Sequence, residues 1–276
     1  MFAMNIVKRD KIAGAVYGFA IGDAMGATTE FLTANQVKTI HGKVKNIVGG
    51  GWLNLRAGEV TDDTQMTACV MNALMKYPDD IDKFKGQCAE NFIAWFCTKP
   101  KDVGGQCSRG IYSVISGHYI EEDDDALGNG SLMRAMPCAI LNKPFFNVEQ
   151  GRITHNNSEC TDLIWMYTRI LQDYLNGNNK YSYIYKDKVH QRPSGCIRNT
   201  LNNAIYWSNK NSFKEAILGA VNDGGDADTI AAITGSLAGA KFGYKNIPQR
   251  WIDQLDSEVK EFLENFINFA FSYLQI

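Results

Sequence analysis

Apolar residues recur at helical spacing along most of the chain. In "TDDTQMTACVMNALMKY" they follow an i, i+4, i+5, i+8 stripe, at Met66, Val70, Met71, Leu74 and Met75. The same kind of pattern runs through residues 81–97, 160–175, 212–223 and 254–274. Strand-like alternation is rare, and its best example, "KVKNIVGGGW", contains three glycines, which favour a loop. The pattern therefore predicts an all-α protein.

Short polar segments separate these predicted helices. They are "YPDD", "TKPKDVGG", "EEDDDALGNG", "LNKPFFN", "LNGNNKYSY" and "HQRPSG", and none is long or biased enough to be an interdomain linker. We therefore expect residues 1–276 to form a single compact domain of many short, orthogonally packed helices. The polar stretch "LNGNNKYSYIYKDKVH" is expected to be a surface excursion. The acidic run Glu121–Asp125 is expected to be solvated or, alternatively, to form a lip at the entrance of a site.

Two series of small residues with a step of four predict a close contact between two helices. The first is Gly14, Gly18, Gly22 and Gly26, and the second is Ala231, Gly235, Gly239 and Gly243. A step of four keeps residues on one ridge of a helix, where missing side chains let another backbone approach. The first series lies in a stretch that superficially resembles a secretory signal. Its glycines and Asp23 favour a buried first helix instead.

Composition and charge narrow the class of function. The hydrophobic fraction of 45% and the charged fraction of 21% are ordinary for a soluble globular protein. A net charge of −2 gives no electrostatic reason to expect nucleic acid or a membrane as partner, and no apolar run reaches the ~20 residues of a membrane span. The seven cysteines form no C-x-x-C pair, so we expect buried thiols in a reducing compartment, the cytoplasm.

Two acidic clusters stand where glycine-containing loops pass into predicted helices. Helix capping explains one acid per helix, but not two acids before a run of small apolar residues that must be buried. Desolvating several carboxylates costs several kcal/mol each unless cations neutralise them. Oxygen ligands without His or Cys favour Mg²⁺ or Mn²⁺, and four acids suit a pair of ions better than one. The candidate ligands, if the two helix starts converge, are Thr61, Asp62, Asp63, Asp226, Asp228 and Thr229.

Five motifs in register resemble the ADP-ribosylglycohydrolase family, in particular its bacterial branch. They are "GFAIGDAMGATTEF", "GEVTDDTQM", "GNGSLMRAMP", "THNN" and "NDGGDADTIAAITGSLAGA", and they span the chain from Lys11 to beyond Tyr244. The resemblance implies one all-α domain with a binuclear Mg²⁺ or Mn²⁺ site at the bottom of a cleft. It implies hydrolysis of the N-glycosidic bond at C1″ of the distal ribose. The substrate would be an ADP-ribosylated protein, typically modified on arginine, and the product ADP-ribose.

The resemblance also implies roles for single residues. It assigns the metal to the same six ligands, and catalysis to Glu30 together with Asp62 and Asp228. Asp102 could face the leaving guanidinium, with which a carboxylate makes a bidentate pair. The residues implied in binding the ADP-ribose are Gly128, Asn129, Gly130, Ser131, Met133 and His155. Taken without the resemblance, "GNGS" could equally be a tight turn, His155 a satisfied turn residue and Asp102 a plain loop acid.

One position departs from the family pattern. Cys196 stands where the family commonly has an aromatic residue against the adenosine, so we expect either stacking from Tyr or Trp in neighbouring loops or a nucleotide end that is held less tightly. In the expected chemistry, Glu30 or an aspartate protonates the leaving nitrogen or activates water. Two alternatives stay open. The chain could hydrolyse another ADP-ribosyl linkage, on serine, O-acetyl-ADP-ribose or nucleic acid, or it could be an immunity-type partner that blocks an ADP-ribosyltransferase. The sequence leaves the oligomeric state open.

Overall fold

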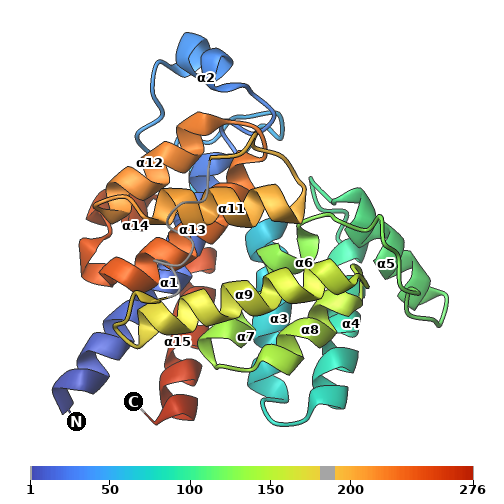
Figure 1. The fold of residues 1–276 in the computed structure, drawn as a ribbon. Helices are drawn as coiled ribbons and strands as arrows, with labels where there is room; N and C mark the ends of the chain where they lie inside the picture. The colour runs from blue at the N-terminus through green and yellow to red at the C-terminus, as the bar shows by residue number, and fades with distance from the viewer. Residues whose placement is uncertain (1, 181–189, 276) are drawn as a thin grey trace.

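The computed structural model describes residues 2–180 and 190–275, and this part of the chain is built from helices (Figure 1). Its backbone pairs in strand fashion only at isolated bridges, so the all-α prediction is confirmed. The helices are α1 (Phe2–Gly26), α2 (Ala34–His41), α3 (Asp62–Lys76), α4 (Ile81–Cys97), α5 (Gly105–Ile115), α6 (Gly130–Met133), α7 (Met136–Ile140), α8 (Pro144–Arg152), α9 (Ser158–Leu175), α11 (Ile197–Ser208), α12 (Phe213–Asp223), α13 (Ala227–Phe242), η1 (Tyr244–Asn246), α14 (Gln249–Gln254) and α15 (Ser257–Leu274).

Polar side chains determine where several of these helices begin. Thr61, Asp80, Asn157 and Ser212 each accept a hydrogen bond from a backbone N–H in the first turn of α3, α4, α9 and α12. Helix α8 begins with Pro144, whose missing N–H costs nothing at the first helical position. The break predicted at "LNKPFFN" is therefore shorter than expected and ends at Lys143.

Helices α1 and α13 form the central pair of the fold. They run antiparallel with their glycine ridges in contact, as the sequence predicts. A Cβ atom placed on Gly18 would lie 2.2 Å from the carbonyl oxygen of Gly235, and one placed on Gly22 would lie 2.0 Å from that of Ala231. Only glycine allows the two backbones to come this close. The contact continues to Gly26, which meets the first turn of α13, so the end of α1 is held against the start of α13.

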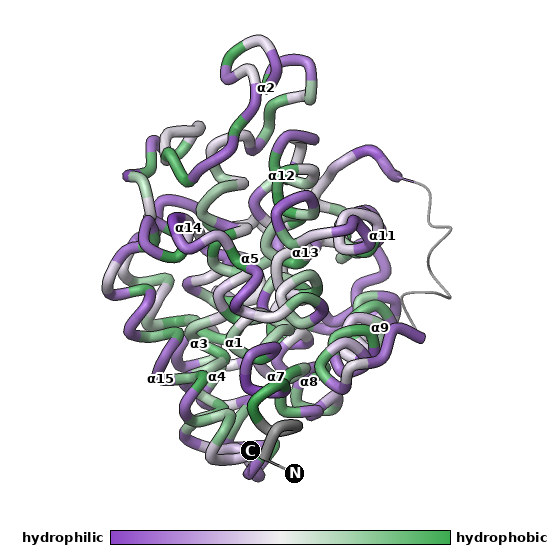
Figure 2. Tube along the Cα trace, turned by 90° about the vertical axis from the view of Figure 1, so that its left-hand side faces the viewer, coloured by the Kyte–Doolittle hydropathy of each residue, from purple (hydrophilic) through white to green (hydrophobic). Residues whose placement is uncertain are grey.

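The other helices cover this pair. Helices α11 and α12 pack on α13, while α3 packs on α4 and α7, and α9 packs on α7 and α8. One hydrophobic cluster extends through the molecule from Ile12 in α1 to Phe271 in α15, and Figure 2 shows apolar residues concentrated along the inner helices. Among the described helices, none combines the length and the apolar character that crossing a membrane requires.

Three further expectations concern the surface and the cysteines. Most of the predicted excursion at 175–190 lies outside the described residues. The acidic run Glu121–Asp125 is largely exposed and borders a shallow cavity beside α5, next to the acid-lined cavity described below. All seven cysteines are free thiols; five are buried, Cys196 is half-buried and Cys97 is exposed.

Candidate active site

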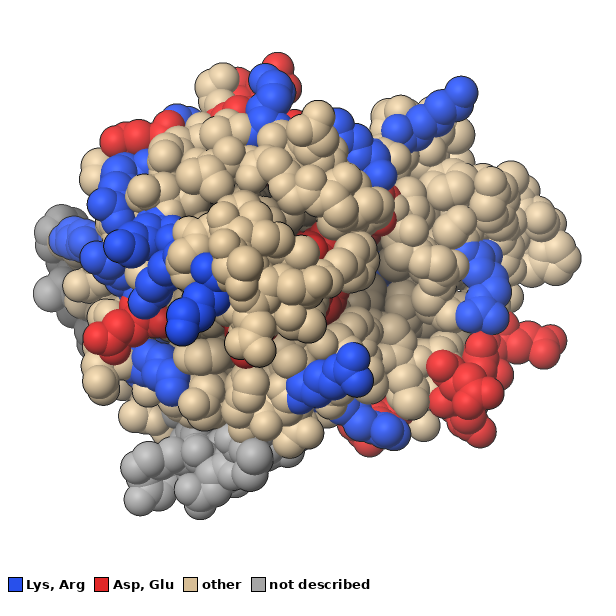
Figure 3. Space-filling view, turned by 90° about the horizontal axis from the view of Figure 1, so that it is seen from above, with Lys and Arg blue, Asp and Glu red and all other residues tan. Residues whose placement is uncertain are grey.

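The acidic clusters meet in one cavity between the end of α1 and the starts of α3 and α13. The cavity has a volume of about 270 Å³, and in Figure 3 acidic side chains are visible at the bottom of the hollow. Twelve of the fourteen residues predicted for the site line it, namely Glu30, Asp62, Asp63, Asp102, Gly128, Asn129, Gly130, Met133, His155, Asp226, Asp228 and Thr229. The other two, Thr61 and Ser131, are buried but are not part of the cavity wall.

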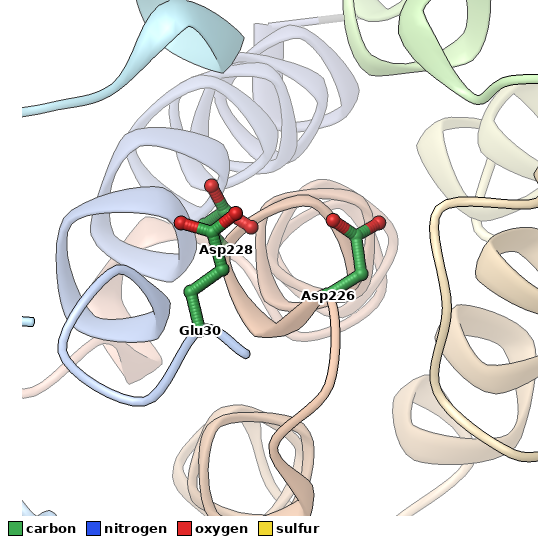
Figure 4. Close-up of side chains that lie close together, drawn as sticks. All are labelled: Glu30, Asp226 and Asp228. Atoms are coloured by element: carbon green, nitrogen blue, oxygen red, sulfur yellow. The ribbon is translucent and has the colours of Figure 1, made fainter. Parts of the chain in front are cut away.

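The carboxylates form two overlapping groups that share Asp228. One oxygen each from Asp62, Asp63 and Asp228 lie within 4.8 Å of one another, and so do oxygens from Glu30, Asp226 and Asp228. Figure 4 shows Glu30 reaching the start of α13 from the end of α1, next to Asp228, with Asp226 turned toward the same space. Asp63 and Asp228 are only 1% and 2% exposed. The starts of α3 and α13 therefore converge, which the predicted metal site requires.

Hydrogen bonds hold some of the carboxylate oxygens and leave others free. The Thr229 hydroxyl donates to Asp63 Oδ2 at 3.1 Å, and Asn129 Nδ2 donates to Asp226 Oδ2 at 2.5 Å. Asp63 Oδ1 is buried and has no hydrogen-bond partner in the described part of the chain. An unpaired buried carboxylate oxygen is costly unless something else satisfies it. A divalent cation would do so, and the all-oxygen donor set suits Mg²⁺ or Mn²⁺.

Burial shifts the pKa values of these acids upward. Burial, with smaller contributions from the charges of Asp226, Asp102 and Asp62, raises the pKa of Glu30 to about 8, although the hydrogen bond from Trp52 opposes the shift. Burial and the charge of Asp102 raise the pKa of Asp62 to about 7. The described residues that line the cavity include no Lys or Arg. The negative charge must therefore be neutralised by protons or by bound cations.

The same cause acts on the remaining acids of the cavity. Burial raises the pKa of Asp226 to about 6, and it raises the pKa values of Asp63 and Asp228 well above their ordinary range. Asp102, which is half-buried, has a pKa raised by the same effect. Divalent cations would therefore have to compete with protons for these oxygens.

Asp23 is a structural acid of the site that sequence reasoning missed. It lies in α1, fully buried, and its carboxylate accepts hydrogen bonds from the backbone N–H groups of Thr61 and Thr64 and from the Thr64 hydroxyl at 2.5 Å. These bonds tie the N-terminus of α3 to α1. The only signal in the sequence is an aspartate among the small apolar residues of "AIGDAMGA".

Trp52 is a second residue that the sequence did not single out. Its indole Nε1 donates a hydrogen bond of 2.6 Å to Glu30 Oε2. The loop before it contains Gly49, Gly50 and Gly51, all with positive φ angles, and Gly51 packs so closely on the backbone of Ala27 that a Cβ atom would lie 2.1 Å from its oxygen. The "GGGW" loop therefore positions the Trp52 indole next to Glu30.

The "GNG" segment is shaped by His155. A Cβ atom on Gly128 would lie 2.9 Å from Nε2 of His155, and one on Gly130 would lie 2.7 Å from its Cε1, so both positions need glycine. His155 Nδ1 is paired with the Thr154 hydroxyl at 2.8 Å. Burial, assisted by the charges of nearby arginines, lowers the pKa of His155 well below its usual range, and the ring is therefore neutral.

Two other residues near this loop are Arg134 and Cys196. Arg134 is fully buried and has a structural role, because its guanidinium donates to the carbonyl oxygens of Gly130 and Gln150 and to the Thr154 hydroxyl. The backbone of Cys196 pairs with that of Gly128 in an isolated β-bridge, and Cys196 is not part of the cavity wall. The described residues that line the cavity include one phenylalanine, Phe31, and no Tyr or Trp.

Comparisons with known proteins agree with this geometry. The family model described as ADP-ribosylglycohydrolase matches residues 4–273. The chain is 33% identical to ADP-ribosyl-(dinitrogen reductase) glycohydrolase of Rhodospirillum rubrum, over 91% of this chain and 92% of that protein. It is 31% identical to ADP-ribosylarginine hydrolase Tri1 of Pseudomonas putida (strain GB-1), over 89% of this chain and 74% of that protein.

The fold agrees as well. A solved structure titled ADP-ribosylglycohydrolase-related protein complex matches with a TM-score of 0.79 and 25% sequence identity, covering 97% of this chain and 98% of the other. The all-α fold and the converging acids thus define a glycosidase that acts on N-glycosyl compounds. The chain belongs to the ADP-ribosylglycohydrolase family.

Proposed function

We propose that this enzyme removes ADP-ribose from modified arginine side chains of proteins, with the help of two divalent cations. The observation that carries the proposal is the convergence of the starts of α3 and α13 on one buried, acid-lined cavity. The names of two relatives support the proposal, since one is an ADP-ribosylarginine hydrolase and the other a glycohydrolase that acts on an ADP-ribosylated protein, dinitrogen reductase.

The proposed metal ligands are Thr61, Asp62, Asp63, Asp226, Asp228 and Thr229. The unpaired oxygen of Asp63 and the raised pKa values of the buried acids support this assignment. When bound, Mg²⁺ or Mn²⁺ would orient the hydroxyls of the distal ribose and lower the cost of activating water. Asp62 and Asp228 would act in catalysis by holding this arrangement.

Glu30 is the proposed proton donor. Burial raises the pKa of its carboxyl to about 8 in the metal-free protein, which favours the protonated form, and a protonated acid can give its proton to the leaving nitrogen at C1″. The hydrogen bond from Trp52 holds Oε2, which leaves Oε1 to carry the proton. Asp102 is proposed to bind the leaving guanidinium through its carboxylate. It lies on the cavity wall near Glu30 and Asp62, since its charge contributes to the raised pKa values of both.

The ADP-ribose itself is proposed to lie along "GNGS" and His155. The backbone at Gly128 and Gly130 has no side chains to keep phosphate oxygens away, and N–H groups bind such oxygens well. His155 is neutral, and its Nε2 lies next to Gly128. Asn129 is proposed to act indirectly by holding Asp226, Met133 to contact the ribose, and Ser131 to support the loop from behind.

A hydrolysis assay over several linkages tests the proposal. The purified chain, stripped of metal and then given Mg²⁺ or Mn²⁺, is incubated with ADP-ribosyl-arginine protein, ADP-ribosyl-serine peptide and O-acetyl-ADP-ribose. We expect release of ADP-ribose from the arginine-linked substrate, and loss of that release in EDTA. Cleavage of another linkage with none on arginine would contradict the proposed substrate, and full activity in EDTA would contradict the proposed metal.

A further inference from the structure

Two exposed aromatic rings lie in contact beside the cavity. Phe31 is 65% exposed and Trp52 is 51% exposed, and their ring centroids lie 5.3 Å apart at an angle of 48°. Phe31 lines the cavity and directly follows Glu30 in the chain. Two exposed apolar rings in contact beside a cavity can form part of a binding surface.

The backbone holds Phe31 in a conformation that large residues rarely adopt. Its φ angle is 62°, in the left-handed region, and such a conformation persists only where the surrounding structure imposes it. Two hydrogen bonds impose it here. Phe31 N donates to the oxygen of Gly225 at 2.6 Å, and Gly225 N donates to the oxygen of Leu32 at 2.7 Å. The turn at the start of α13 therefore presents the Phe31 ring to solvent.

Trp52 is also held in place while much of its surface stays open. Its N–H is used by Glu30, and the glycine loop fixes the backbone on Ala27. The indole needs no further polar partner, so its exposed surface is free for a ligand. An indole face and a phenyl face are good partners for a flat cation.

One acid of the cavity favours a cation beside the pair. Asp102 lines the same cavity as Phe31 and is neither a proposed metal ligand nor the proposed proton donor, and no Lys or Arg appears among that cavity's described lining residues. A carboxylate in this position attracts a positive group. A guanidinium is planar and weakly hydrated, and it stacks on aromatic rings more readily than an ammonium does.

We propose that Phe31 and Trp52 form a guanidinium platform that receives the modified arginine of the target protein. This inference rests on the proposed function and names the part of the site that selects an arginine linkage. The pair adjoins Glu30, the proposed donor to the leaving nitrogen, so the leaving guanidinium lies within reach of both rings. Adenine is the competing occupant, but it is neutral and gains nothing from the charge of Asp102.

The test removes the phenyl ring and compares two binding steps. Phe31→Leu keeps an apolar side chain without a π face, and Phe31→Trp restores one. Phe31→Asn suits the positive φ angle and separates loss of the ring from backbone strain. The matched control is Phe145→Leu in α8, because Phe145 is 67% exposed and also pairs with a tryptophan, Trp165, at 5.3 Å, but lies away from the cavity. Circular dichroism verifies that each variant is folded.

Two constants are measured on metal-loaded protein, the KM for ADP-ribosyl-arginine and the Kd of ADP-ribose by calorimetry. We expect Phe31→Leu and Phe31→Asn to raise the KM about 5- to 30-fold, the size of a cation–π contact, with kcat largely retained. The Kd of ADP-ribose should move less than about twofold, Phe31→Trp should recover the KM, and Phe145→Leu should match the wild type.

Two results would overturn the inference. An unchanged KM in both ring-less variants would remove the platform, and a parallel weakening of ADP-ribose binding would assign the rings to the adenosine instead. Failure of the wild-type protein to cleave any arginine-linked substrate is a separate outcome, because it contradicts the proposed function itself.

Discussion

The Thr229 hydroxyl at the start of α13 donates a hydrogen bond of 3.1 Å to Asp63 Oδ2 at the start of α3. These residues are 166 positions apart in the chain, and the bond joins the two helix starts that carry the acids. The positive ends of both helix dipoles point toward the carboxylates and reduce their repulsion. They do not remove it, since the pKa values of Asp63 and Asp228 remain well above their ordinary range. Binding of protons or cations by these carboxylates is therefore strongly favoured.

Asp228→Asn is expected to abolish activity and leave the fold intact. Asp228 belongs to both acid groups, so its loss should weaken metal binding and lower kcat/KM at least ~100-fold. The metal-free variant should be no less stable than the wild type, because one member of a like-charged buried cluster is gone. Hydrolysis assays and thermal unfolding with and without Mn²⁺ measure both effects. Asp82→Asn, an exposed acid in the first turn of α4, is the control and should behave as the wild type.

Gly18→Ala is expected to destabilise the protein by ~2–4 kcal/mol, because its Cβ atom would overlap the backbone of Gly235. Gly86→Ala in α4 is the matched control. No atom lies within 4 Å of a Cβ placed there, so the substitution should stabilise the helix by ~0.5–1 kcal/mol. Urea unfolding gives both free energies. Equal effects of the two substitutions would mean that the α1–α13 contact does not require glycine.

Asp23→Ala is expected to lower the free energy of unfolding by ~2–4 kcal/mol. Two buried N–H groups and a hydroxyl at the start of α3 would lose their acceptor. Asp23→Asn keeps one acceptor oxygen and should cost less. Asp80→Ala, which removes an exposed N-cap of α4, should cost clearly less than Asp23→Ala. An Asp23→Ala variant as stable as the wild type would show that the hydrogen bonds to Asp23 do not anchor α3.

The stability of the metal-free protein is expected to fall as the pH rises from about 5 to 8. Burial raises the folded-state pKa values of Asp226, Asp62 and Glu30 to about 6, 7 and 8, above their unfolded values of 3.8 and 4.5. Folding therefore favours the protonated acids, and that stability is lost as these acids ionise. Mn²⁺ should reverse the trend, since it replaces the protons.

Thermal unfolding in EDTA and in Mn²⁺ across this pH range measures the effect. The gain in Tm on adding Mn²⁺ should grow with pH. A metal-free protein whose Tm rises steadily from pH 5 to 8 would contradict the assignment of raised pKa values to the cavity acids.

Much of this protein could be predicted from local sequence. The spacing of apolar residues predicted the helices, and α4 begins and ends where the pattern does, at Ile81 and Cys97. The two glycine series predicted the α1–α13 contact, because a step of four has few uses other than close packing. The paired acids Asp62–Asp63 and Asp226–Asp228 identified the site, because capping alone accounts for one acid at each helix start.

Other features could not be read from the chain, because they depend on partners far away in sequence. Asp23 looks like a stray acid in a helix until Thr61 and Thr64 are placed against it. Trp52 looks like a loop residue until its indole meets Glu30. The family resemblance assigns the glycines at 128 and 130 to binding of the ADP-ribose, and the close approach of His155 provides a second reason for them.

Local patterns thus specified the helices, the ridge along which two of them touch and the acids at their ends. These are properties of single segments, governed by helical periodicity and by the cost of burying charge. Tertiary structure decided which side chains restrain those acids, that the Phe31 and Trp52 rings lie in contact, and that one oxygen of Asp63 is left unpaired. Hydrogen bonds and ring contacts act over a few ångströms between residues that only the folded chain brings together.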